Sequence, residues 1–184
     1  MSTFEELGQL DDGQFHRLCD SVLRRVEPRY RHLRPHGVND GGQSVKGQPD
    51  SYVGNTASAC QIAFCYTTQR GSWWSKIVSD VKAARENCLD AEEIVVAVPR
   101  DVDREKPKDD SLDWLSDAEA AAGDALLTVY DGRKLSCLLD EECLDIRYEF
   151  LGIPYSRLSA SAISASCRMV NRQTIADLRG KGRY

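Results

Sequence analysis

The sequence predicts an α/β fold in which helices flank a mixed central sheet. Apolar residues recur at helical spacing in some segments, and they alternate or run continuously, as in strands, in the segments between. In chain order these segments read helix, strand, strand, helix, strand, helix, strand. That order is typical of a layered α/β domain with a mixed sheet.

The first half of the chain supplies one helix and two strands. An apolar stripe from Phe15 to Val26 predicts the helix, with Asp11 or Asp12 as its N-cap. Its opposite face carries His16, Arg17, Arg24 and Arg25. The strands are expected over 51–54 and 60–68, where apolar and polar residues alternate. A further short strand is expected near Leu33.

The second half continues the α/β alternation. Ser72 is the expected N-cap of a helix over 73–88, whose apolar residues form one stripe. Further elements are predicted as a strand over 93–98, a helix over 113–123, a strand over 125–130 and a helix over 140–151. Residues 134–139 fit either a strand or the start of a helix. We expect one domain over residues 1–158 and a C-terminal helix or connector over 159–184.

Size and composition are those of a soluble domain. The chain has 184 residues, 41% of them hydrophobic and 29% charged, so one domain can bury a real core. No apolar run approaches the roughly 20 residues that span a membrane, and the acidic N-terminus is no secretory signal. Seven cysteines without a Cys-x-x-Cys pair indicate reduced, buried thiols. We therefore expect a cytoplasmic protein without membrane partners.

Basic residues gather in one part of an otherwise acidic chain. The net charge is −5, which argues against nucleic-acid binding by the whole surface. A local basic face can still contact phosphates, and the alternative is a solvated helix face and loop. The predicted nucleic-acid contacts are Arg24, Arg25, Arg29, Arg31, Arg34 and Lys46.

The stretch from Gly37 to Thr68 carries the most specific motif. A glycine-rich segment ends in Pro49-Asp50, where the strand over 51–54 begins, and a short polar gap separates it from the next strand. This layout resembles the restriction-endonuclease-like nuclease superfamily, whose motif is Pro-Asp, a spacer and acid-x-Lys on the following strand. The resemblance implies a three-layer core with a mixed sheet between helices, and Mg²⁺-dependent or Mn²⁺-dependent cleavage of DNA.

The second half of that motif is degenerate. The strand offers Gln61, Ala63, Cys65 and Thr67, and none of these is a carboxylate or a lysine. In one register Gln61 supplies a second metal ligand, as in superfamily members with glutamine in place of glutamate. In the other register Cys65 and Thr67 take the places of the acid and the lysine, and thiolate is a poor Mg²⁺ ligand.

The resemblance implies a set of site residues. Asp50 and Gln61 would hold the metal ion with Asp40, and Lys76 would replace the strand lysine from the adjacent helix, as in some superfamily members. Each has a structural alternative. Pro-Asp and Asn-Asp-Gly are common turn sequences, Gln61 can be a polar strand residue bonded to a neighbour, and Lys76 can pair with Asp80 one helical turn on.

The leading hypothesis is thus a Mg²⁺-dependent DNA endonuclease domain, with Asp50, Gln61 and Lys76 as its catalytic residues. The alternative is a degenerate nuclease fold that binds nucleic acid or protein. Leu126–Pro154 resembles N-terminal nuclease-like domains of bacterial defence ATPases. That resemblance implies an antiviral effector domain followed by an NTPase region, and a homo-oligomer is a further expectation.

Overall fold

The computed structural model describes residues 2–36, 48–105 and 113–154. The chain divides into two units, Met1–Leu151 and Gly152–Tyr184. Every element below belongs to the first unit. The helix or connector predicted over 159–184 lies outside the described residues.

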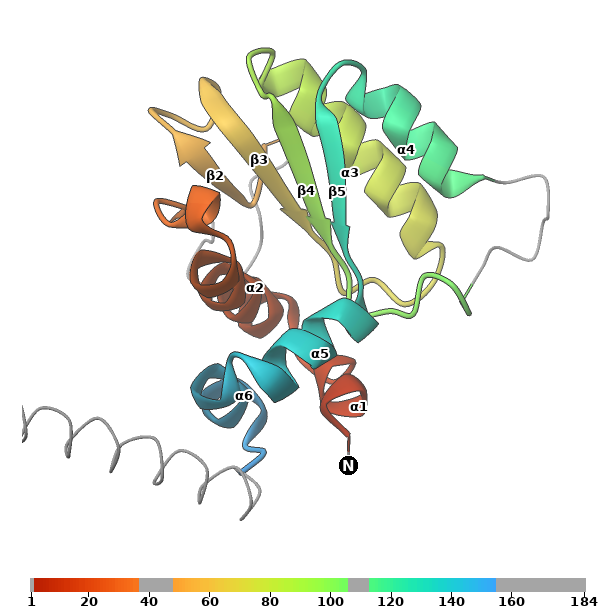
Figure 1. Ribbon diagram of the computed structural model, residues 1–184. Helices are drawn as coiled ribbons and strands as arrows, with labels where there is room; N and C mark the ends of the chain where they lie inside the picture. The colour runs from red at the N-terminus through yellow and green to blue at the C-terminus, as the bar shows by residue number, and fades with distance from the viewer. Residues whose placement is uncertain (1, 37–47, 106–112, 155–184) are drawn as a thin grey trace, which may run out of the picture. The chain divides into compact units, whose positions relative to one another are not determined.

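A five-stranded mixed sheet forms the centre of the first unit (Figure 1), as the sequence predicts. Its strands lie side by side in chain order, antiparallel from β1 to β3 and parallel from β3 to β5. Their bounds are β1 Arg34–Pro35, β2 Ser51–Gly54, β3 Cys60–Tyr66, β4 Glu93–Ala97 and β5 Leu126–Tyr130. Because β3, β4 and β5 are parallel, Tyr66, Ala97 and Tyr130 end at one border of the sheet, which we call the carboxyl edge.

The pairing of β2 with β3 decides which residues can share a site. Ser51 lies opposite Phe64, and Gly54 lies opposite Cys60 at the other end of the pair. Asp50, directly before β2, therefore lies beside the carboxyl end of β3. Gln61 lies beside the opposite end.

Two helices cover one face of the sheet, α3 (Trp73–Asn87) and α4 (Trp114–Ala122). The predicted stripe of α3 is confirmed, since Trp73, Ile77 and Val81 are buried in a cluster with β3, β4 and α4. Ser72 is the N-cap residue of α3, as predicted, but it adopts a left-handed conformation and its side chain makes no cap hydrogen bond.

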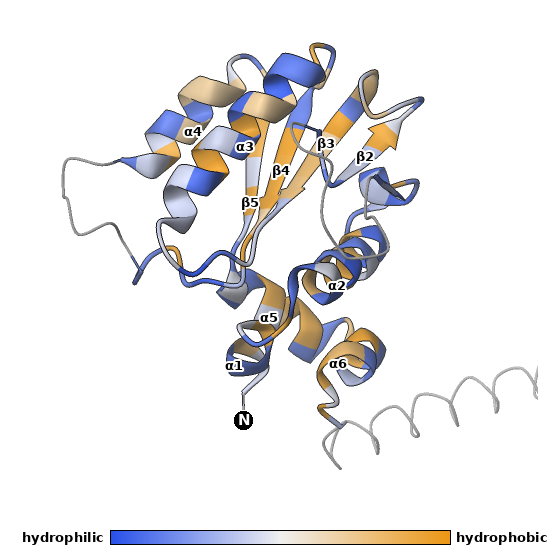
Figure 2. Cartoon of the chain, turned by 180° about the vertical axis from the view of Figure 1, so that it is seen from behind, coloured by the Kyte–Doolittle hydropathy of each residue, from blue (hydrophilic) through white to orange (hydrophobic). Residues whose placement is uncertain are grey.

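The other face is covered by α2 (Asp12–Val26), the 3₁₀ turn η1 (Pro28–Tyr30) and α5 (Gly132–Glu141), with α1 (Thr3–Leu7) and α6 (Leu144–Leu151) packed on α5. Figure 2 shows the apolar strands between these helical layers. Asp11 caps α2 through its side chain, as predicted. No helix within the described ranges has the length and apolar character that a membrane crossing requires.

Residues 140–151, which were predicted to form one helix, belong to two helices. Residues 132–141 form α5, which settles the open assignment of 134–139 as helical. The amide groups of Glu142 and Cys143 both donate to the carbonyl oxygen of Leu138 and end α5 there. Cys143 is fully buried, so the turn places it in the core before α6 begins.

Gly132 allows α1, α5 and the segment after β4 to meet at the carboxyl edge. A Cβ atom at this position would lie 2.7 Å from Cε2 of Phe4 and 3.0 Å from backbone atoms of Pro99 and Arg100. The amide of Gly132 also donates to the carbonyl oxygen of Arg100 at 2.8 Å. Only glycine fits this approach without a shift of the backbone.

Replacing Gly132 by Ala is expected to lower the free energy of unfolding by about 1–3 kcal/mol, the usual cost of overpacking. Urea unfolding followed by circular dichroism measures it. Gly71→Ala is the control, because no heavy atom lies within 4 Å of a Cβ built there. Equal stability of the two variants would contradict this account of Gly132.

Candidate functional site

Asp50 is held in a fixed orientation at the carboxyl edge. Its amide donates to the carbonyl oxygen of Phe64 at 2.8 Å, and its Oδ2 accepts the amide of Tyr66 at 2.7 Å. The side chain is buried, with the residue 7% exposed. Pro49 fixes its own φ just before the strand begins. The Asp50 carboxylate therefore lies against the end of β3 and does not face bulk solvent.

His16 of α2 faces the same carboxylate. Its Nδ1 lies 3.9 Å from Oδ1 of Asp50, beyond hydrogen-bond distance, and has no hydrogen-bond partner among the described residues. The ring packs edge-on against Tyr66, with centroids 5.2 Å apart. Burial lowers the pKa of His16, against the opposing charges of Asp12 and Asp20. A neutral imidazole thus borders Asp50.

Asp20, one helical turn after His16, joins α2 to β2 and β3. Its Oδ1 accepts hydrogen bonds from the hydroxyl groups of Ser51 and Tyr66, both at 2.8 Å. Burial raises the pKa of Asp20, although these two hydrogen bonds act in the opposite direction. Asp20 therefore fixes the sheet end on which Asp50 stands.

The expected position of His16 on the polar face of its helix is wrong. His16 and Asp20 are both 5% exposed and face the sheet. They continue the buried side of α2 beyond the apolar stripe, and their partners are polar groups of other elements. Their spacing of four residues, next to the apolar pair Phe15 and Cys19, is the signal in the sequence that could have identified them.

Lys76 approaches the carboxyl edge from α3. Its Nζ forms an ion pair with Oδ1 of Asp80, as the structural alternative expected, and its side chain is 43% exposed. The charge of Lys76 also acts on His16 and on Cys65. Burial raises the pKa of Cys65, and the charges of Asp50 and Asp80 raise it further. The charges of Asp50, Lys76 and Asp80 thus all act on the pKa of Cys65, near one end of β3.

Gln61 does not belong to this group, so the expectation that it shares a metal site with Asp50 is wrong. Tyr66, which binds Asp50, lies five residues further along β3, about 16 Å at the usual rise of a strand. Gln61 instead lines a cavity of about 380 Å³ at the opposite border of the sheet, with Arg29 and Glu93. The antiparallel register of β2 and β3 causes this separation.

The register places Cys65 and Thr67 at the end of β3 beside Asp50. They flank Tyr66, whose amide binds Asp50, and both are buried. Cys65 and Thr67, and not Gln61, are therefore the residues of this strand that lie beside Asp50.

The described residues do not form a Mg²⁺ ligand set. Among them, no three His, Cys, Asp or Glu side chains are placed to hold a metal ion. Of the three predicted ligands, Asp50 stands at the carboxyl edge, Gln61 is remote, and Asp40 lies outside the described residues, as does Lys46. A metal site built on Asp50 and Gln61 is thus excluded by the geometry.

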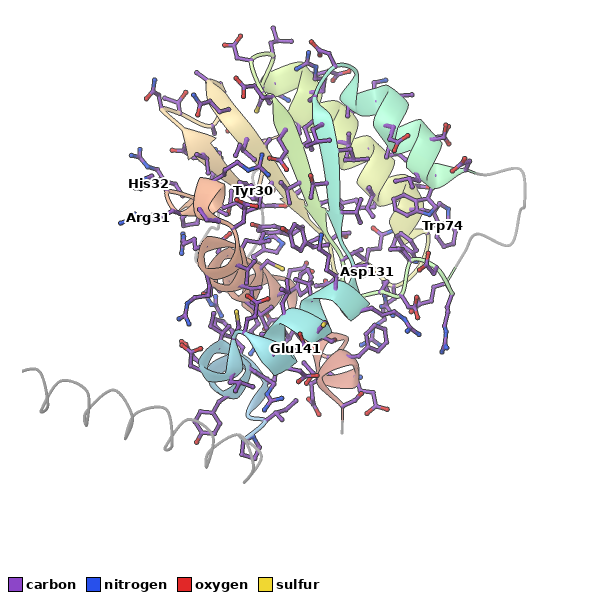
Figure 3. The ribbon with its side chains drawn as sticks, viewed as in Figure 1. Tyr30, Arg31, His32, Trp74, Asp131 and Glu141 are labelled. Carbon is purple, nitrogen blue, oxygen red and sulfur yellow. The ribbon has the colours of Figure 1, made fainter. Side chains whose placement is uncertain are left out.

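Three of the five clustered arginines bind other groups of the protein. Arg24 donates to the carbonyl oxygen of Leu33, Arg25 pairs with Asp145 of α6, and Arg29 pairs with the buried Glu93. Arg31 and Arg34 are exposed, and Figure 3 shows Arg31 pointing outward from η1. The cluster is mainly a set of structural contacts.

A second group of arginines lies at the carboxyl edge. Two adjoining cavities of about 530 and 260 Å³ share Phe4 and Glu105 in their walls. Their walls also contain Arg70, Arg100, Arg104 and Arg133. Arg133 and Arg104 pair with the buried Asp101, and Arg100 lies 3.8 Å from Glu105. The anchored side chains border the same edge as Asp50.

Sequence reasoning missed this group because its members are far apart in the chain. Arg70 follows β3, Arg100 and Arg104 follow β4, and Arg133 begins the helix after β5. Parallel strands bring their carboxyl ends together, and ligands of α/β sheets bind at those ends. A basic residue shortly after each of three strands was therefore the available signal.

Comparison with known proteins gives no assignment, because neither a protein-family model nor a curated protein matches this chain. The carboxyl edge itself holds the observations that bear on function. This edge combines a buried, oriented carboxylate with a partly exposed lysine and a border of arginines. Such a combination can bind an anion such as a phosphodiester next to a fixed carboxylate.

Asp20→Ala is expected to lower the free energy of unfolding by roughly 2–4 kcal/mol, because two buried hydroxyl groups lose their acceptor. Asp20→Asn keeps an acceptor oxygen and should cost much less at pH 7. Since the folded-state pKa of Asp20 is raised, its stabilising effect is full below the unfolded pKa near 3.8 and is lost as the pH rises through the folded pKa.

Wild type should therefore gain stability relative to Asp20→Asn as the pH is lowered from 7 towards 4. Denaturant unfolding at several pH values measures the difference. A difference that does not change with pH would contradict the burial of the charged form.

Proposed function

We propose that this chain is a restriction-endonuclease-like domain that acts on DNA, with Asp50 at the centre of its site. The observation that carries the proposal is the Asp50 carboxylate, which Tyr66 holds at the end of β3. The Pro-Asp motif of that superfamily likewise has its aspartate directly before an antiparallel strand pair that a helix follows. Lys76 of that helix supplies a cation at the same edge, as the resemblance implies.

The chain's own residues would bind and orient the phosphodiester. Lys76 would exchange its ion pair with Asp80 for a phosphate oxygen, and the partly exposed arginines of the carboxyl edge would hold neighbouring phosphates. The ring of His16 would line the site beside Asp50, with Nδ1 3.9 Å from Oδ1 of that residue.

Nucleases of this superfamily use Mg²⁺ or Mn²⁺, which would supply an activated water and neutralise developing charge. The described residues offer Asp50 but no complete ligand set for such an ion. Mg²⁺ sites commonly use only one or two carboxylates together with substrate phosphates. The proposed requirement for Mg²⁺ or Mn²⁺ therefore rests on the resemblance.

Incubating the purified chain with supercoiled plasmid and Mg²⁺ or Mn²⁺ tests the proposal. Wild type should nick the plasmid. Asp50→Ala and Lys76→Ala should each slow nicking about a hundredfold or more, as when one group that stabilises a transition state is removed. Lys82→Ala, at an exposed position of the same helix, should nick as wild type. Nicking unchanged in Asp50→Ala, or none by wild type, would contradict endonuclease activity at this site.

The second candidate function is DNA binding without cleavage by a degenerate nuclease fold. Its supporting observation is that Cys65 and Thr67 occupy the places of the acid and the lysine beside Asp50. Calorimetric titration with Mg²⁺ separates the two candidates. A degenerate site gives no heat that depends on Asp50, whereas a nuclease site loses its binding heat in Asp50→Ala.

Both candidates predict that DNA contacts the arginines of the carboxyl edge. The double variant Arg70→Ala/Arg104→Ala should weaken DNA binding and reduce the slope of log K against log salt by about two. Fluorescence anisotropy in EDTA measures binding without cleavage. The control is Arg31→Ala/Arg34→Ala, which also removes two exposed arginines. A larger loss in the control would place DNA on the α2–η1 side instead.

The proposal includes a cytoplasmic location and an antiviral effector role. The six described cysteines are free thiols, which supports a reducing compartment such as the cytoplasm. The resemblance to N-terminal domains of defence ATPases supports an antiviral effector role, with an NTPase region as the functional partner.

A further inference from the structure

The two outer strands of the sheet, β1 and β5, differ in how well they are protected against pairing with another strand. β1 has only two residues, one of which is Pro35, and its Arg34 is exposed. β5 has five residues, Leu126–Tyr130, with no charge and no proline among them. Native proteins usually protect edge strands with charge, proline, bulges or short length. β5 lacks all of these within its bounds.

The backbone of β5 offers unused hydrogen-bonding groups on the side that faces away from β4. The amide of Leu126 donates to Glu92, and the carbonyl of Tyr130 accepts from Val98, so these residues point towards β4. Direction alternates along a strand, and the backbone groups of Leu127 and Val129 therefore point away from the sheet. They make no hydrogen bond to another described residue.

We propose that β5 is a dimer interface, in which two copies of this chain pair antiparallel through β5 about a two-fold axis at Thr128. The residues whose backbone groups are free would then meet, Leu127 with the partner's Val129 and Val129 with the partner's Leu127. This pairing forms about four backbone hydrogen bonds and joins the two sheets into one. The inference is independent of the proposed function.

The side chains of β5 are complementary to themselves in this register. Leu126, 57% exposed, lies opposite the partner's Tyr130, and Thr128 lies opposite the partner's Thr128. On the other face Leu127 lies opposite the partner's Val129. Aromatic–aliphatic and Thr–Thr pairs are favourable cross-strand neighbours.

Charges at the two ends of β5 favour the same antiparallel arrangement. Asp124, before the strand, pairs with Arg85 but has an 85% exposed side chain, and Arg133, after the strand, pairs with Asp101 but has a 52% exposed side chain. Antiparallel pairing brings Asp124 near the partner's Arg133. A parallel arrangement would bring like charges together instead. A second copy of this chain, related by a two-fold axis, is therefore the partner that fits β5 best.

The pairing also fixes how the two carboxyl edges are arranged. Antiparallel β5 strands run in opposite directions, so the carboxyl edge of one copy points away from that of its partner. The two Asp50 sites would therefore be independent, and neither needs residues of the other copy.

Sedimentation velocity over a wide range of protein concentration tests the proposal. Wild type should form a dimer, and Leu126→Lys should raise the dissociation constant at least about tenfold, since each copy would bury a lysine against the partner's Tyr130. Leu89→Lys is the matched control, because Leu89 is 71% exposed outside β5. A wild type that is monomeric throughout, or equal dissociation constants for the two variants, would overturn it.

A second variant tests the register directly. Thr128→Cys, in a chain whose Cys137 and Cys167 are serine, should form a disulfide-linked dimer on mild oxidation, because the two Thr128 residues face each other at the axis. The same chain with Leu89→Cys is the control. Cross-linking of Thr128→Cys no faster than this control would overturn the two-fold pairing.

Discussion

The hydrogen bond from the amide of Tyr66 to Oδ2 of Asp50 is the contact on which the site depends. It exists because β2 and β3 pair so that Ser51 lies opposite Phe64. Gly54 helps to set that register, since a Cβ there would lie 2.6 Å from Cα of Cys60. A slip of one residue would turn Tyr66 to the other face of the sheet and remove the ring from Asp20.

Several polar groups are buried around this contact, and their burial is tolerated because most of them have partners. Asp20 accepts from two hydroxyl groups, and Asp50 accepts from a backbone amide. His16 is the exception among them, since its Nδ1 has no hydrogen bond to a described residue. A group like this is costly to bury, and such groups gather where a protein binds or reacts. This pattern favours a binding site over a purely structural cluster.

The fold was more predictable from sequence than the site. Helical and strand spacing identified α2, α3, β3, β4 and β5, because each has a local periodic signal. The register of β2 with β3 has no such signal, which is why Gln61 was assigned to a site that lies about 16 Å away along the strand. The arginines of the carboxyl edge were missed for the same reason: only tertiary contacts bring Arg70, Arg100 and Arg133 together.

Under the proposed function, Cys65 and Thr67 would stand where related nucleases have an acid and a lysine. That difference does not by itself decide between cleavage and binding. The lysine function needs a cation near the phosphate, and Lys76 can supply it from α3, since its charge already acts on Cys65 and His16. The carboxylate function is harder to replace, because Asp80 is paired with Lys76 and burial raises its pKa. A phosphate that took Lys76 from this pair would release the Asp80 carboxylate. Under the proposed function, competition between Asp80 and a phosphate for Lys76 would therefore separate cleavage from binding alone.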